Sequence, residues 1–197
     1  MNLLAATTNP HKLAEIRALL AGLPVRVETL AAHPALGAPE ETGTTFAANA
    51  RLKAAYYGSR SGLRAVADDS GLEIDALDGA PGVRSARFNG ASYPQKFAAI
   101  YELLRARGVA GSAARFVCAV AVADGERIVF EARGVVEGRI AGAPAGGGGF
   151  GYDPIFFYPP YGRTLAELSP AEKAAISHRG QAFRALRGFL QTTPRGR

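Results

Sequence analysis

The sequence predicts a mixed α/β fold, and three observations support this prediction. Strand-like and helix-like apolar segments alternate along the 197 residues. A long antiparallel hairpin around Asp124-Gly125 argues against a purely doubly wound sheet. Hydrophobic residues make up 48% of the chain and charged residues 20%, which suits a folded protein rather than a disordered one. We expect residues 1–197 to form one domain, or two lobes that share a core.

The first predicted elements are a strand, a helix and a short strand. Residues 2–7 are mostly apolar and predict a strand. Asn9 followed by Pro10 is typical of a helix start, since Asn caps the free amides and Pro suits the first helical position. The helix keeps one apolar face through Leu20. Residues 25–30 predict the next strand, and the polar, proline-bearing segment after it predicts a loop.

Residues 44–104 predict two further helices around a buried strand. The first helix spans roughly 46–57 and is capped by Thr44 or Thr45. Residues 63–68 are apolar on both faces, as expected for a buried strand, and residues 71–77 are expected to form another strand. Ser92 is expected to start a helix that runs through Leu104.

The last third predicts the hairpin, a glycine-rich loop and two helices. Residues 114–140 form the hairpin, in which Cys118 is expected to be a buried, small apolar side chain. Residues 144–154 contain four consecutive glycines and precede a short strand, 155–158. Ser169-Pro170-Ala171-Glu172 is a capping box, and a final helix follows it.

Composition excludes several classes of protein. The net charge of +6 comes from scattered residues, so we expect no nucleic-acid partner. We expect no signal peptide and no membrane span, and a lone cysteine permits a reducing compartment, so we expect a cytoplasmic protein. One cysteine and three scattered histidines give no zinc-ligand spacing, and no motif for acyl transfer is present.

Two polar segments in the first 45 residues are candidate binding sites. The turn from Thr7 to Lys12 joins a strand to a helix, whose N-terminus together with Lys12 suits a phosphate. An ordinary helix cap with an exposed lysine is the alternative. Glu40 and Glu41 precede Thr42-Gly43, and they form either a solvated acidic loop or part of a site.

Adjacent carboxylates at Asp68 and Asp69 end the buried strand. Successive strand residues point to opposite faces, so both can face one site only if the strand bends there. Two unpaired carboxylates among apolar residues are costly, and Mg²⁺, which takes oxygen ligands, would relieve the repulsion. A carboxylate beside a metal can also deprotonate water. Alternatively, one Asp is exposed and the other caps a turn at Ser70-Gly71.

The glycine-rich loop and a segment near residue 178 form a further candidate site. Glycines let a backbone approach a ligand closely, and Phe150 and Tyr152 can stack on a flat ring. Lys173, His178 and Arg179 can hold phosphate or carbonyl oxygens. Together these residues predict a pocket for a flat, charged ligand, although a glycine loop alone is more often only flexible.

Five motifs together resemble the inosine/xanthosine triphosphate pyrophosphatase family. They are ATTNPHKLAEI, EETGTTFAANARLKA, AVADDSGLEIDALDGAPGVRSARFNG, PAGGGGFGYDPIFF and TLAELSPAEKAAISHRGQA, and they cover about residues 2–190. The resemblance implies an elongated mixed sheet with flanking helices and two lobes around a central substrate cleft. It also implies a homodimer that uses Mg²⁺ to convert ITP, dITP or XTP to the monophosphate and pyrophosphate.

The resemblance also implies roles for individual residues. Asp69 matches the proton acceptor and metal ligand, with Asp68 beside it, and Glu41 matches a second metal ligand. Phe150 matches a residue that stacks on the purine. The remaining matches are substrate contacts: Thr7, Thr8, Asn9, Lys12, Ser70, Gly151, Tyr152, Asp153, Lys173, His178 and Arg179. Ala48 stands where many members have a glutamate, which puts the full ligand set of the metal in question.

Two other functions remain open from the sequence. One is a phosphohydrolase for pyrimidine or methylated nucleotides. The other is a non-catalytic nucleotide or RNA binder, which the acidic pair argues against because carboxylates at a phosphate site need a metal. For purine choice, Arg179 or a backbone amide is expected to donate to the oxygen at C6, which leaves the amino group of adenine facing a donor.

Overall fold

The computed structural model describes residues 1–192 and confirms a mixed α/β fold. Seven strands form one sheet in the order β2-β1-β3-β4-β5-β6-β7. β1 pairs parallel with β2 and β3, whereas β5 pairs antiparallel with β6, and β6 with β7. The chain divides into two compact units. Each unit has a hydrophobic cluster of its own.

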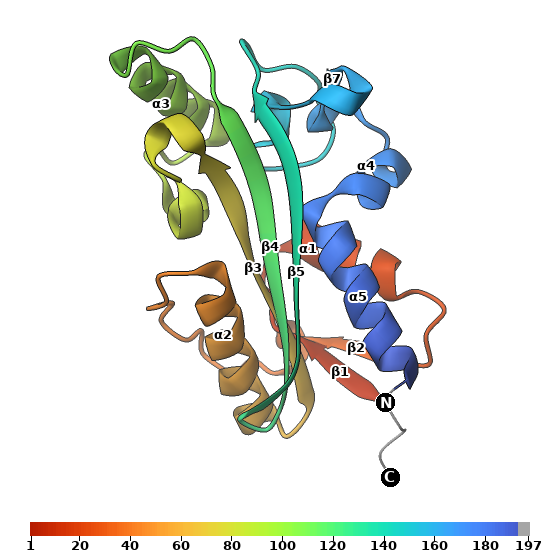
Figure 1. Cartoon of the computed structure of the whole chain (residues 1–197). Helices are drawn as coiled ribbons and strands as arrows, with labels where there is room; N and C mark the ends of the chain where they lie inside the picture. The colour runs from red at the N-terminus through yellow and green to blue at the C-terminus, as the bar shows by residue number, and fades with distance from the viewer. Residues whose placement is uncertain (193–197) are drawn as a thin grey trace. The chain divides into compact units, whose positions relative to one another are not determined.

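The first unit comprises residues 1–69, 118–134 and the segment from Arg179 onward. Its elements are β1 (Asn2–Ala5), α1 (Pro10–Leu20), β2 (Arg26–Thr29), α2 (Phe46–Ser61), the start of β3 (Arg64–Ile74), the adjoining parts of β4 (Ala113–Asp124) and β5 (Arg127–Ile140), and α5 (His178–Thr192). Figure 1 shows α2 and α5 on opposite sides of the strands. The hydrophobic cluster joins strand residues such as Leu3 and Val120 to Ile16 of α1 and Phe183 of α5.

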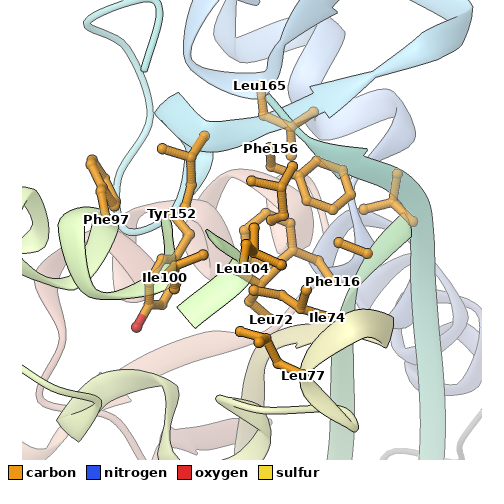
Figure 2. Packing of buried hydrophobic residues seen from close by; sticks show 14 of the residues in the cluster. Leu72, Ile74, Leu77, Phe97, Ile100, Leu104, Phe116, Tyr152, Phe156 and Leu165 are labelled. Atoms are coloured by element: carbon orange, nitrogen blue, oxygen red, sulfur yellow. The ribbon is translucent and has the colours of Figure 1, made fainter. Parts of the chain in front are cut away.

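The second unit comprises residues 70–117 and 135–178. It holds the remaining parts of β3, β4 and β5, together with α3 (Tyr93–Ala106), β6 (Phe156–Tyr158), β7 (Arg163–Thr164) and α4 (Pro170–Ile176). Figure 2 shows Leu72 of β3 packed with Leu104 of α3, Phe116 of β4 and Phe156 of β6. This apolar layer supports the loop that carries Tyr152.

The predicted elements are present, but several bounds differ: β1 ends at Ala5 instead of residue 7, and α2 continues to Ser61 instead of residue 57. Residues 63–68 and 71–77 were expected to be separate strands, but β3 runs without interruption from Arg64 to Ile74, so Ser70-Gly71 is not a turn. The hairpin turn consists of Gly125 and Glu126, one residue later than expected, because Gly125 adopts a φ of +63°. The strand pair that includes the two-residue β7 was not predicted.

The predicted helix caps are confirmed. The Asn9 side chain accepts hydrogen bonds from the amides of His11 and Lys12, and Thr45, not Thr44, caps α2. Ser169 and Glu172 make both hydrogen bonds of the capping box at α4. Among residues 1–192, no helix is both long and apolar enough to cross a membrane.

Candidate active site

Asp68 and Asp69 point to opposite faces of β3. Because both residues lie within β3, their side chains alternate as in any extended strand. Asp68 contacts residues of α1 and α5, whereas Asp69 contacts residues of α2. The two adjacent carboxylates therefore contact different helices.

Asp68 is fully buried between two cations. Its Oδ2 lies 2.8 Å from Nζ of Lys12 and 3.4 Å from Nη2 of Arg179, and its side chain is 0% exposed. Arg179 also donates through Nη1 to Glu15, at 2.6 Å. The expectation of an unpaired Asp68 carboxylate is wrong, because two basic side chains of this unit already offset its charge.

Asp69 belongs to a second cluster, on the α2 side. Its Oδ2 accepts a hydrogen bond of 3.0 Å from Asn49, and its Oδ1 lies 3.5 Å from Nζ of Lys53. The same Lys53 ammonium lies 2.8 Å from Oε1 of Glu41. Asn49 in turn accepts a hydrogen bond from the amide of Gly43. Asp69 and Glu41 therefore share a single ammonium, and Asn49 holds the loop next to Glu41.

The surroundings shift the pKa values of the two aspartates in opposite directions. Burial alone would raise the pKa of Asp68, but Lys12 and Arg179 outweigh burial and hold it well below its usual range. Burial raises the pKa of Asp69, which Lys53 and Asn49 oppose only in part. Burial would also lower the pKa of Lys53, but the carboxylates around it raise the pKa instead, so Lys53 is charged. Asp69 is the better proton acceptor of the pair.

The described residues contain no group of three or more His, Cys, Asp or Glu side chains placed to hold a metal ion. The predicted set of Glu41, Asp68 and Asp69 is thus not assembled, because Asp68 faces the other side of β3. Glu41 and Asp69 do converge on one cationic atom, as their shared contact with Lys53 shows. Mg²⁺ is commonly bound by one or two carboxylates, with water and phosphate completing its shell. The pair therefore fits such an ion.

The turn before α1 offers a cation rather than free amides. The amides of His11, Lys12 and Leu13 all donate to Asn9, through its side chain or its carbonyl. Thr7 accepts a hydrogen bond from the amide of Asn9, and Thr8 is exposed. At this turn we therefore expect a phosphate to be bound by the Lys12 ammonium rather than by the helix amides, which already donate to Asn9.

In the second unit, Asp153 organises the glycine-rich loop. Its buried Oδ2 accepts a hydrogen bond of 2.7 Å from the amide of Phe150 and lies 2.7 Å from Nζ of Lys173. The Lys173 ammonium lies 4.5 Å from the centre of the Phe150 ring. Gly149 has a φ of +66°, and a Cβ there would clash with the Asp153 carboxylate. This turn therefore requires glycine at position 149. It places the half-buried ring of Phe150 beside Lys173.

Tyr152 anchors this loop instead of facing outward. The residue is 3% exposed, its hydroxyl donates to the carbonyl of Ser85 at 2.8 Å, and its ring packs against Tyr93 and Phe97. The expectation that Tyr152 stacks on a ligand is not supported by this position. His178 is also buried, with its ring stacked on Phe116, and Ser70 is partly buried in β3.

Three residues of the first unit's clusters were not among the predicted site residues: Glu15, Asn49 and Lys53. A signal for two of them exists in the sequence. Asn49 and Lys53 are four residues apart on a predicted helix and therefore share one face of it. Lys53 is also one of only four lysines in a chain that otherwise uses arginine. Nothing in the sequence indicated that Glu15 would contact Arg179, 164 positions away.

Comparison with known proteins finds relatives over nearly the whole chain. The model of the Ham1 family matches residues 3–189. A dITP/XTP pyrophosphatase of Gloeobacter violaceus is 49% identical over 184 residues, which are 93% of this chain and 91% of that protein. Another, from an Exiguobacterium species, is 46% identical, over 94% of this chain and 95% of that protein.

Solved structures of Ham1 proteins are also similar to this chain. A HAM1 protein from Coxiella burnetii superposes with a TM-score of 0.91 at 41% identity, covering 98% of this chain and all of that chain. The Ham1 protein of Staphylococcus aureus gives a TM-score of 0.87 at 33% identity, covering 97% of this chain and 98% of that chain.

Proposed function

The chain belongs to the Ham1 family, and we propose that it hydrolyses non-standard purine nucleoside triphosphates (ITP, dITP and XTP) to the monophosphate and pyrophosphate. One observation carries the proposal. Two relatives that align with nearly the whole chain, at 46% and 49% identity, bear the name dITP/XTP pyrophosphatase. The resemblance drawn from the sequence motifs is thereby confirmed at the level of the family.

On the phosphate side, basic residues of the first unit offset the charge of the substrate. The triphosphate is tetra-anionic, and its repulsion must be reduced before water can attack phosphorus. Lys12 supplies a positive charge at the turn that also contains Thr7, Thr8 and Asn9. Its position is supported by its 2.8 Å contact with Asp68, which fixes the ammonium beside β3. We assign Asp68 to this orienting role and not to the metal.

Glu41 and Asp69 would hold Mg²⁺, the ion proposed as cofactor. When bound, the ion supplies positive charge that polarises phosphate oxygens and favours ionisation of water. Asn49 supports this assignment, because it bonds both Asp69 and the loop next to Glu41 and so keeps the two carboxylates together. Ala48 contributes no carboxylate, and two protein ligands with water and phosphate are sufficient for Mg²⁺.

Asp69 acts as the general base. It accepts a proton from the water that attacks the α-phosphorus, and the bond from that phosphorus to the pyrophosphate oxygen breaks. Burial raises the pKa of Asp69, which makes it a stronger proton acceptor than an exposed aspartate. Asn49 donates to Oδ2 of Asp69 and so fixes the orientation of the carboxylate. A general base typically contributes about 10²–10⁴-fold to the rate.

Residues of the second unit recognise the base. Phe150 is half-buried and offers its ring for stacking on the purine, while Lys173 and Asp153 fix its position. Gly151, with a φ of +70°, follows Phe150 without adding a side chain next to the ring. Tyr152 anchors this loop through the hydrogen bond from its hydroxyl to the carbonyl of Ser85. Ser70, His178 and Arg179 remain proposed substrate contacts, and the last also anchors Asp68.

A substrate panel tests the proposal. Purified protein with Mg²⁺ is given ITP, dITP, XTP, ATP, GTP, a pyrimidine triphosphate and a methylated nucleotide, and both pyrophosphate and orthophosphate are measured. We expect pyrophosphate from ITP, dITP and XTP and much slower turnover of the others. Faster turnover of a pyrimidine or methylated nucleotide, or release of orthophosphate, would refute the proposal and favour the alternative function, a different phosphohydrolase. Salt-sensitive binding to polynucleotide without turnover would establish the binding protein.

We further propose that the protein is a cytoplasmic homodimer. The dimer is the state implied by the family resemblance, and light scattering coupled to size-exclusion chromatography measures it directly. A monomer mass near 20.5 kDa in that experiment would refute the dimer. The cytoplasm is the compartment that contains the nucleotide pool on which the proposed activity acts.

A further inference from the structure

The Lys53 side chain occupies the point at which Glu41 and Asp69 meet. Its ammonium lies 2.8 Å from Oε1 of Glu41 and 3.5 Å from Oδ1 of Asp69. The side chain is only 12% exposed, and its backbone is fixed in the middle of α2. Neither carboxylate is fully exposed to water, so the shared ammonium offsets part of their mutual repulsion.

A divalent ion that uses these two carboxylates must compete with this ammonium. Both cations need the same oxygens, and the ammonium is tethered, so it is present at a permanently high local concentration. A charged ammonium within a few ångströms also repels an incoming divalent ion. Binding of a metal alone therefore requires the Lys53 contacts to break first.

We propose that Lys53 is a positioning residue that occupies the carboxylate pair in the metal-free protein and is displaced when the metal binds. Lys53 keeps Glu41 and Asp69 together while it lowers the metal affinity of the free protein. The ion consequently enters with the nucleotide, whose phosphates supply further ligands and receive the displaced ammonium. The inference rests on the proposed function for the identity of the ion, but its tests do not require turnover.

The first test is metal binding to the protein without nucleotide. Isothermal titration with Mg²⁺, and with Mn²⁺ as a second probe, compares wild type with Lys53→Met and Lys53→Gln. We expect both variants to bind the ion about tenfold or more tightly, because a repelling charge and a competitor are removed. Lys53→Arg, which keeps the charge, should remain close to wild type. Unchanged or weaker binding by folded Lys53→Met and Lys53→Gln would overturn the proposal.

Arg51→Met is the matched control. Arg51 lies on the same helix but is exposed and pairs with Glu131 instead of the two carboxylates. Its replacement removes the same charge, so a general electrostatic effect would tighten metal binding equally in both variants. We expect a change of less than about twofold for Arg51→Met. Equal tightening in Arg51→Met and Lys53→Met would overturn a specific role for Lys53.

The second test measures the response of the wild-type protein to the metal, and a variant serves only to assign one NMR signal. The chain has four lysines, so labelling lysine with ¹³C at Cε gives a small set of NMR signals, and Lys53→Arg identifies the one of interest. Addition of Mg²⁺ should move the Lys53 signal, whereas Lys96, which donates to the carbonyl of Ala86, should not move. A stationary Lys53 signal at saturating metal would refute the exchange.

Failure of the proposed function would look different. A substrate panel without turnover, combined with tighter metal binding by Lys53→Met, would remove the assigned reaction and leave the cation exchange standing. Normal turnover of ITP by wild type, combined with unchanged metal affinity in Lys53→Met, would refute the cation exchange and leave the proposed reaction standing.

Discussion

Neutralising Asp68 is expected to destabilise the first unit while leaving its shape almost unchanged. Asp68→Asn removes one charge and replaces an oxygen by a nitrogen, so packing in the fully buried site is kept. The variant brings an amide instead of a carboxylate towards Lys12 and Arg179. Both cations then lose the anion that compensates them, and Arg179 is itself almost completely buried.

The magnitude follows from the distances. At an effective dielectric constant of about 20, unit charges at 2.8 Å and 3.4 Å attract by about 6 and 5 kcal/mol. Desolvation offsets much of this attraction, and breaking a buried pair typically costs about 3–5 kcal/mol. Arg179 retains Glu15, and Lys12 is 17% exposed, so part of the loss is recovered. We expect a decrease of about 3 kcal/mol in the free energy of unfolding, or about 6–12 °C in Tm.

Urea unfolding at pH 7, followed by circular dichroism, measures this loss. The control is Asp124→Asn, because Asp124 pairs with Arg64 at 3.1 Å but is 46% exposed. Exposed ion pairs contribute about 1 kcal/mol or less. The free energy of unfolding of Asp124→Asn should therefore differ from that of wild type by no more than about 1 kcal/mol. Equal stabilities of Asp68→Asn and Asp124→Asn would refute the argument that Asp68 is an essential buried counterion.

Three further predictions follow from the same geometry. Asp69→Asn should abolish turnover in the pyrophosphate assay yet retain ITP binding by calorimetry; rates like those of wild type would exclude Asp69 as the base. Phe150→Ala should raise KM for ITP by about tenfold, since base–aromatic stacking contributes about 1–3 kcal/mol, and an unchanged KM would argue against stacking. Because the pKa of Asp68 is lowered on folding, its stabilisation is present above the unfolded pKa of about 3.9 and is lost as the pH falls below it. The stability difference between wild type and Asp68→Asn should therefore shrink from pH 5 to pH 3, as measured by urea unfolding; a constant difference would contradict the shift.

Local signals predicted the helices and the sheet type well. Asn9-Pro10 and the Ser169–Glu172 box specify helix starts through hydrogen bonds within a few residues, and both are present. The continuity of β3 was not predicted, because Ser70-Gly71 resembles a turn when only the neighbours are considered. In the structure Gly71 approaches Ser85 so closely that a Cβ would clash with its hydroxyl. This glycine serves packing against a distant segment, which a local pattern does not reveal.

The residue types of the site were predictable, but their pairing was not. Lys12, Asp68 and Arg179 were all recognised as polar residues at the ends of elements, yet each was expected to face a ligand. Their mutual contact joins positions up to 111 residues apart, and charge alone does not specify which acid meets which base. Lys53 was missed because it lies in the middle of a helix and not at its end.

The alternation of β3 explains how adjacent aspartates acquire different chemistry. Two carboxylates on one face of a site would share a proton and titrate as a pair. Here the backbone separates them, so Asp68 meets Lys12 and Arg179, whereas Asp69 meets an amide and one tethered ammonium. Environments that push two neighbouring pKa values apart assign separate roles to the two groups. Asp68 thus remains an anion that orients cations, and Asp69 keeps the higher proton affinity that a base requires. Moving Asp69 by a single position along the strand would exchange these surroundings, which is why the order of faces, and not merely the acidic pair, determines the proposed chemistry.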